Sequence, residues 1–502
     1  MYKILLYFYF LTLINCTTID KLIFASLHSR HGARAPLDCD SNQFDFLGEK
    51  WTNPGELTPT GQRMEYILGL RNHQRYIVER EFLSENFDPH EILVYSTNVN
   101  RTILSMASQL QGLYPMYKKY GEKLSKEQQK VAYPPVNISE ETKEEVGKLN
   151  DSALPNYMTI IPIRTLLTSD RKMNVQDSSG CKDKVNKTRD YNKVNKEILK
   201  YLSGQFNQKY SENLGKFYDK NPKGFKYDFD WIGLFCDTLV SDYSDGRKME
   251  DFFKRTEIKQ SELLKDCREI IYHNFKDDFY GDDKGEVILL AESNLIKEVL
   301  HYMKLKIDED ISGKNSKNAS DYSKPKMLIY SGHDSTLSGE ELFMLKYFGL
   351  GTEHFRYPNY TTQFAFEVTK DGDIEDLKYT SYNVSFYINE DLIFSRNFEE
   401  FKKTIENNVW SAEQISEFCE DSKNPENPEN PENSDKSDKS EDNFFKDIQL
   451  YLLIGIGCLV LIFIIIIICL AIKLKNLNNN SAFSDGDDED KDKGLMNEDE
   501  HN

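Results

Sequence analysis

Side chains of the kinds that bind and transfer anionic groups follow three apolar segments of the sequence. The segments span residues 21–27, 91–96 and 326–331, and the side chains that follow them are Arg30, His31, Arg34, Arg101, His333 and Asp334. Arginine presents planar, paired N–H donors that suit the oxygens of a phosphate group. Three guanidiniums with two imidazoles therefore predict a site for a tetrahedral dianion, with Asp334 as the acid among them.

Such a set favours phosphoryl chemistry in which guanidiniums supply the positive charge that Mg²⁺ supplies elsewhere, so we predict neither a metal ion nor a cofactor. The sequence contains no P-loop, no dinucleotide-binding glycine motif, no zinc-ligand spacing and no EF-hand loop. A single histidine after a strand is more often an ordinary loop residue, and Arg101 alone could be a surface charge. Basic residues after three separate predicted strands, taken together, favour an anion-binding site over these ordinary roles.

The three apolar segments have the length of strands, and each is followed by a helical pattern. These patterns span residues 59–82, 102–114 and 337–348, and residues 287–303 also have a helical pattern. Alternating strands and helices predict an α/β fold with a mainly parallel central sheet flanked by helices. The carboxyl ends of parallel strands meet at one edge of a sheet, so the six side chains should converge there. We expect a smaller, mostly helical subdomain to be inserted around residues 140–280.

The two ends of the chain predict a type I single-pass membrane protein. Residues 1–16 contain a lysine and a short apolar run typical of a secretory signal peptide, although a buried N-terminal strand is an alternative. Residues 450–472 carry no charge and predict a transmembrane helix, and the lysines just after it place the acidic tail, residues 473–502, in the cytosol. Between the expected ectodomain, residues 17–420, and this helix, residues 421–446 predict an extended stalk.

Charge, sequons and cysteines agree with an exported body. The net charge of −20 disfavours nucleic acid as a partner. The expected ectodomain holds seven Asn-x-Ser/Thr sequons, at Asn100, Asn137, Asn150, Asn186, Asn318, Asn359 and Asn383. It also holds five cysteines, an odd number, so one thiol could stay free; Cys419 could attach the end of the body to the rest.

The motifs resemble those of the histidine acid phosphatases, a branch of the phosphoglycerate-mutase-like superfamily. Residues 30–36, Arg-His-Gly-Ala-Arg-Ala-Pro, are similar to the family's first motif, residues 332–336, Gly-His-Asp-Ser-Thr, to its second, and residues 96–105 to the segment with its third arginine. The resemblance covers roughly residues 20–390. With the stalk and the membrane helix, the layout is similar to that of a membrane-anchored lysosomal-type acid phosphatase.

The resemblance implies a role for each residue. His31 would be the nucleophile that accepts the phosphoryl group, Asp334 would protonate the leaving alcohol, and the phosphate oxygens would be held by Arg30, Arg34, Arg101 and His333. We expect the surrounding cations to lower the pKa of His31 and keep it neutral in mild acid. We also expect an environment that raises the pKa of Asp334, with an acidic optimum for the pair.

The resulting hypothesis is a metal-independent acid phosphatase that acts on small phosphate monoesters in the lysosomal or cell-surface membrane, with its ectodomain lumenal or extracellular. The alternatives are a phytase-like phosphatase, and a catalytically silent cell-surface receptor or adhesion protein on the same fold. The oligomeric state is left open, with a homodimer as one option. A glycan on Asn100 would sit on the site, so we predict that this sequon is unoccupied.

Overall fold

The computed structural model describes residues 20–37, 51, 53–115, 123–166, 181, 193–218, 226–280, 285–313, 324–370 and 377–420. All of these residues belong to one compact unit, Met1–Lys423. The expected signal peptide, stalk, transmembrane helix and acidic tail lie outside the described residues. Within the described ranges, none of the helices combines the length and apolar character needed to cross a bilayer.

The described strands form one sheet in the order β3-β2-β4-β1-β5-β6-β7. They span Lys21–Arg30 (β1), Ile92–Thr97 (β2), Arg164–Leu166 (β3), Met327–Gly332 (β4), Gln363–Lys370 (β5), Tyr382–Ile388 (β6) and Asp391–Asn397 (β7). Strands β1 to β4 pair in parallel, as expected, whereas β5, β6 and β7 pair antiparallel. The sheet is therefore mixed rather than mainly parallel. The turn between β6 and β7 has two residues, Asn389 and Glu390, both at positive φ, and so short a connection can only return the chain antiparallel.

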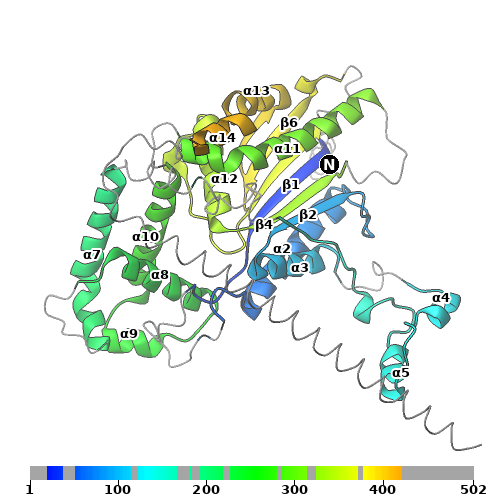
Figure 1. The fold of residues 1–502 in the computed structure, drawn as a ribbon, viewed down its shortest axis with the longest axis horizontal. Helices are drawn as coiled ribbons and strands as arrows, with labels where there is room; N and C mark the ends of the chain where they lie inside the picture. The colour runs from blue at the N-terminus through cyan, green and yellow to red at the C-terminus, as the bar shows by residue number, and fades with distance from the viewer. Residues whose placement is uncertain are drawn as a thin grey trace, which may run out of the picture. The chain divides into compact units, whose positions relative to one another are not determined.

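Helices cover both faces of the sheet (Figure 1). On one face lie α2 (Pro59–His73), continued by the π-helical segment η1 (Gln74–Glu79), and α3 (Asn100–Leu113); on the other lie α11 (Glu286–Ser312), α12 (Asp334–Tyr347) and α13 (Phe398–Asn408). Strand β4 serves both layers, because Leu328 and Tyr330 join the core under α11 and α12 while Met327 and Ile329 join the core under α2 and α3. This alternation is what a strand buried on both faces requires.

Four helices between β3 and β4 enclose a hydrophobic cluster of their own. They are α7 (Lys193–Phe217), α8 (Phe229–Ser244), α9 (Glu250–Thr256) and α10 (Gln260–Tyr280), which lie together at the left of Figure 1. A disulfide between Cys236 and Cys267 joins α8 to α10. The proposed domain boundaries stay a prediction, but these helices supply one wall of the site described below.

The remaining described elements are short, apart from the last helix. They are α4 (Lys126–Val131), α5 (Glu140–Gly147), η2 (Pro155–Tyr157), η3 (Thr352–His354), η4 (Tyr379–Ser381) and α14 (Ala412–Glu420). A disulfide between Cys181 and Cys419 attaches α14 to the body, which confirms the expectation for Cys419. The fifth cysteine of the expected ectodomain, Cys39, lies outside the described residues.

Close backbone contact holds the loop after β1 against the start of α2. Thr58 caps α2 through its hydroxyl, which accepts from the N–H of Gly61, and the backbone N–H of Thr58 donates to the carbonyl of Ala33. A Cβ on Gly61 would lie 2.1 Å from the Ala33 oxygen, and one on Gly32 would lie 2.4 Å from the Gly61 oxygen. Only glycine at both positions lets the loop that carries His31 approach the helix this closely.

We predict that Gly61→Ala lowers the free energy of unfolding by about 1–3 kcal/mol, because the new methyl group would overlap backbone atoms that cannot move aside cheaply. Chemical denaturation followed by circular dichroism measures the change. Gly204→Ala is the matched control, since Gly204 lies within α7 with no neighbouring atom near the added carbon. That control should stabilise the protein by about 0.5–1 kcal/mol. Equal effects of the two substitutions would contradict the close-contact argument.

Candidate active site

The carboxyl ends of β1, β2 and β4 meet at one edge of the sheet, as predicted. The register aligns Arg30 of β1 with Gly332 of β4, and Ser96 of β2 with Ser331 of β4. Five of the six predicted side chains line one cavity of about 700 Å³: His31, Arg34, Arg101, His333 and Asp334. The sixth, Arg30, lines a neighbouring cavity instead, although it donates a hydrogen bond to Asp334.

His31 is 1% exposed and has a defined tautomer. Its Nδ1 lies 2.9 Å from the carbonyl oxygen of Gly32. A carbonyl can only accept, so Nδ1 carries the proton and Nε2 keeps its lone pair when the ring is neutral. Burial, followed by the charges of Arg30 and Arg101, holds the pKa of His31 well below its usual value, in the direction we expected. The site thus contains an unprotonated imidazole nitrogen in mild acid.

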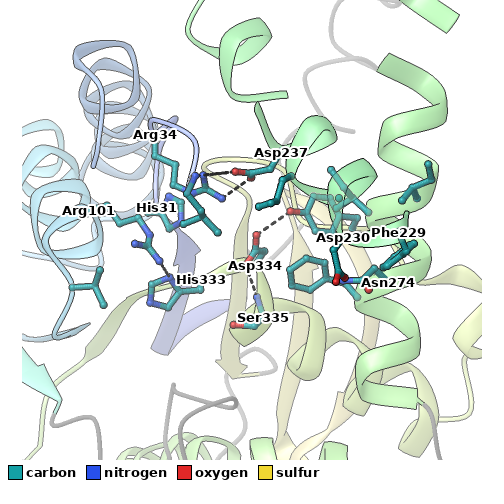
Figure 2. Close-up of a pocket in the computed structure, with 18 residues that line it drawn as sticks. His31, Arg34, Arg101, Phe229, Asp230, Asp237, Asn274, His333, Asp334 and Ser335 are labelled. Atoms are coloured by element: carbon teal, nitrogen blue, oxygen red, sulfur yellow. Dashed lines mark hydrogen bonds and ion pairs between the residues drawn. The ribbon is translucent and has the colours of Figure 1, made fainter. Parts of the chain in front are cut away.

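His333 also has a single tautomer in this arrangement. Its Nδ1 accepts from Nη2 of Arg101 at 3.2 Å, because a guanidinium can only donate. The proton therefore lies on Nε2, which donates to the hydroxyl of Thr97 at 3.0 Å. Burial and the charge of Arg101 lower the pKa of His333 to about 4. Figure 2 shows His333 beside Arg101 on the same side of the cavity as His31.

The three guanidiniums differ in their counter-charges. Arg34 forms a two-point ion pair with Asp237 of α8, at 2.8 and 3.2 Å. Arg30 donates to Asp334 at 2.7 Å and stacks over the ring of Tyr360, 4.3 Å from its centre. Arg101 has no carboxylate partner among the described residues, and burial together with the charge of Arg34 lowers its pKa to about 10. Arg101 therefore has the least neutralised charge of the three.

Asp334 carries three hydrogen bonds that favour its charged form. Its Oδ2 accepts from Arg30 and, at 2.9 Å, from the hydroxyl of Tyr357, while Oδ1 accepts from the backbone N–H of Ser335. Burial raises the pKa of Asp334, but Arg30, Arg34 and the Tyr357 hydrogen bond lower it by more, so the pKa lies below its ordinary value. Our expectation of a raised pKa for Asp334 is wrong for the ligand-free protein. That expectation rested on the requirement that a general acid hold its proton, and it did not include the guanidinium of Arg30, which lies 2.7 Å away.

Several residues that shape the site were not found from the sequence. Asp237 is 203 residues from Arg34 and belongs to no recognisable motif. Tyr357 and Tyr360 lie in the loop before β5, and the abundance of tyrosine in the chain hid them. Thr97 could have been identified from the sequence, because it directly follows the predicted strand at residues 91–96. The rule that polar residues after a parallel strand lie at the edge of the sheet, which identified Arg101, applies to it as well.

No group of three histidine, cysteine, aspartate or glutamate side chains in the described part of the chain is arranged to hold a metal ion. The cationic groups of the site are guanidiniums, which suit an anionic ligand. The absence of a metal from the reaction stays a prediction, to be tested with a chelator. Asn100 donates from its side-chain amide to Glu56, 3.1 Å away, and the prediction that it carries no glycan also stays open.

Comparisons of the sequence with known proteins find phosphatases, in agreement with a site built for an anionic ligand. The family model described as histidine phosphatase superfamily (branch 2) matches residues 21–388. Prostatic acid phosphatase of Bos taurus is 25% identical over 333 residues, which cover 66% of this chain and 70% of that protein. Lysosomal acid phosphatase of Xenopus laevis is 36% identical over 95 residues, 19% of this chain and 21% of that protein. With several other relatives, too, the match spans only about a fifth of the relative's length.

Among solved structures, the phytase from Citrobacter braakii has a TM-score of 0.49 at 13% identity, covering 80% of this chain and 99% of that one. The family model spans most of the described body, and all six predicted side chains lie within it. The family and the acid phosphatases among the relatives support phosphomonoesterase activity. On this evidence, the chain belongs to the histidine phosphatase superfamily, branch 2.

Proposed function

We propose that this protein is an acid phosphatase that hydrolyses phosphate monoesters through a phosphohistidine intermediate on His31. The observation that supports the proposal most directly is the state of His31, a buried imidazole held in one tautomer, with a lowered pKa, beside three guanidiniums. A neutral imidazole nitrogen is a nucleophile, and cations at the site stabilise the charge of a transferring phosphoryl group.

In the first step, the lone pair on Nε2 of His31 attacks phosphorus and the bond from phosphorus to the ester oxygen breaks. Asp334 gives its proton to that oxygen, so the alcohol leaves neutral. In the second step, water attacks the phosphohistidine, Asp334 takes a proton from the water, and the P–N bond breaks to release phosphate. Arg34 and Arg101, which line the cavity, would hold the phosphoryl oxygens throughout. The resemblance assigns the same role to Arg30 and His333, whose N–H groups would have to turn from Asp334 and Thr97 to reach the phosphoryl group.

The lowered pKa of Asp334 in the ligand-free protein is compatible with this role. A phosphoryl dianion brings negative charge beside the same guanidiniums that lower the pKa of Asp334. Substrate binding should therefore raise the pKa of Asp334 relative to the free protein, and the carboxyl group would gain its proton in the complex. Because the acid must be protonated, turnover should decrease as the pH rises and Asp334 loses its proton.

We expect the purified body of the protein to release phosphate from an aryl phosphate without added metal and to keep this activity in chelator. Assayed from about pH 4 to pH 8, the rate should have its maximum on the acid side of this range. His31→Ala should reduce turnover by about a thousandfold or more, because the nucleophile is lost. His354→Ala replaces an exposed histidine outside the cavity and should leave activity unchanged. A folded protein without turnover would favour the receptor or adhesion alternative, and full activity in His31→Ala would contradict the proposed nucleophile.

The pair Tyr357 and Tyr360 tests the role of Asp334. Tyr357→Phe removes a hydrogen bond to the carboxylate, so the pKa of Asp334 should rise and the alkaline limb of the kcat profile should move up by about one pH unit. Tyr360→Phe is the matched control, since its hydroxyl contacts Ser241, at 3.2 Å, and not Asp334. Equal shifts in both variants, or none in Tyr357→Phe, would show that Asp334 is not the group titrating in that limb.

We also propose that the protein is anchored in a membrane of the secretory pathway, lysosomal or at the cell surface. Two disulfides support an oxidising compartment, and several relatives are named lysosomal acid phosphatase. The apolar run at residues 450–472 supports the anchor. Activity should stay in the membrane pellet after alkaline carbonate extraction, and ending the chain after Glu420 should release it. Release of the full-length chain by carbonate would contradict the anchor.

A further inference from the structure

The cavity has a second wall that differs in chemistry from the wall around His31. Helices α8 and α10 supply it, and the residues they contribute are Phe229, Asp230, Gly233, Leu234, Asp237, Ile270, Ile271, Asn274 and Phe275. None of these side chains is cationic, and most are apolar. Figure 2 shows Phe229, Asp230 and Asn274 across the cavity from Arg101 and His333. A cavity of about 700 Å³ is far larger than a phosphoryl group, so this wall faces the alcohol part of a bound ester.

Two polar groups on this wall have no partner among the residues that the structure describes. Asp230 and Asn274 form no hydrogen bond or ion pair with any described residue, whereas Asp237, on the next turns of α8, is fully engaged with Arg34 and with the backbone N–H of Leu37. The carboxylate of Asp230 is therefore the one unneutralised charge that the described residues of the wall present to the alcohol part of a substrate.

From this we propose that the cavity selects phosphate monoesters of apolar alcohols that carry an amine, and that Asp230 is the specificity-determining residue. The inference rests on the proposed phosphatase function. Apolar parts of the alcohol would be buried against Phe229, Leu234 and Phe275. An ammonium group would be attracted by Asp230, and the amide oxygen of Asn274 could accept from it. A second phosphate would face the same carboxylate with no guanidinium among the described lining residues of this wall to hold it, so polyphosphorylated substrates, as a phytase takes, should be rejected.

Asp230 also has an ordinary structural role that the test must separate. It lies in the first turn of α8, where a carboxylate interacts favourably with the helix dipole. Asp251 occupies the corresponding position in α9, two residues after the cap, and does not line the cavity. Asp251→Asn therefore reproduces the loss of charge at a helix start, and the change in net charge, without altering the substrate's surroundings.

The experiment compares aryl phosphates that bear an aminomethyl, a methyl or a carboxymethyl group at the para position, at low ionic strength and about pH 5.5. Asp230 is exposed to solvent. We therefore expect kcat/KM to fall in that order by about threefold to fivefold per step, the upper part of the range for a solvent-exposed charge pair, and inositol hexakisphosphate to be the poorest substrate. Asp230→Asn should remove most of the spread, Asp230→Lys should invert it, and Asp251→Asn should keep it. Added salt should reduce the spread in the unmodified protein.

A preference for the carboxymethyl compound, no preference at all, or a spread that survives in Asp230→Asn would overturn the inference. Failure of the phosphatase proposal gives a different result, namely no turnover of any ester, or turnover that persists in His31→Ala. The inference can be decided even then, because the corresponding arylmethylphosphonates cannot be hydrolysed. Their dissociation constants, measured by titration calorimetry, should follow the same order and respond to Asp230→Asn in the same way.

Discussion

Positive charge kept away from water is the constraint on which this site depends. Arg30, Arg34 and Arg101 lie close enough to one another and to His31 to affect the pKa values of neighbouring groups. Burial adds to the free-energy cost of keeping their positive charges together. Two of them are stabilised by carboxylates, Asp334 and Asp237, while Arg101 remains without one in the described structure. A phosphoryl dianion would relieve this excess of positive charge, so the same electrostatics that destabilise the empty site favour its ligand.

The counter-charges come from elements far from the strands that carry the guanidiniums. Asp237 lies on α8, next to Cys236, whose disulfide to Cys267 fixes α8 against α10. The ion pair with Arg34 thus couples the helical cluster α7–α10 to the loop after β1. The same two helices form the wall that faces the alcohol part of a substrate. In the proposed function, phosphate binding and substrate selection would therefore depend on one interface between the sheet and the helices.

Much of the parallel part of the fold could be predicted, because strands such as β4 are continuous apolar runs bounded by polar residues. The antiparallel strands β5 to β7 were missed, because polar or charged residues interrupt the apolar pattern of each, as they do in many surface segments. The sheet was therefore expected to be mainly parallel. The six side chains predicted from strand ends do come together at the sheet edge, five of them lining the cavity and Arg30 contacting Asp334, while their roles stay a prediction. The pKa of Asp334 was predicted in the wrong direction, because a pKa depends on distances to Arg30 and Tyr357 that residue types do not specify.

Residue types and their places at strand ends specify which chemistry is available, because they depend only on local patterns and on the rule that parallel strands end at one edge of a sheet. The folded arrangement specifies which groups act on one another. It assigned the tautomers of His31 and His333 through their partners, paired Arg34 with Asp237 across 203 residues, and placed the apolar wall with Asp230 opposite the cations. These are contacts between segments distant in the chain, and electrostatic and packing energies depend on such distances in space rather than on separation in sequence.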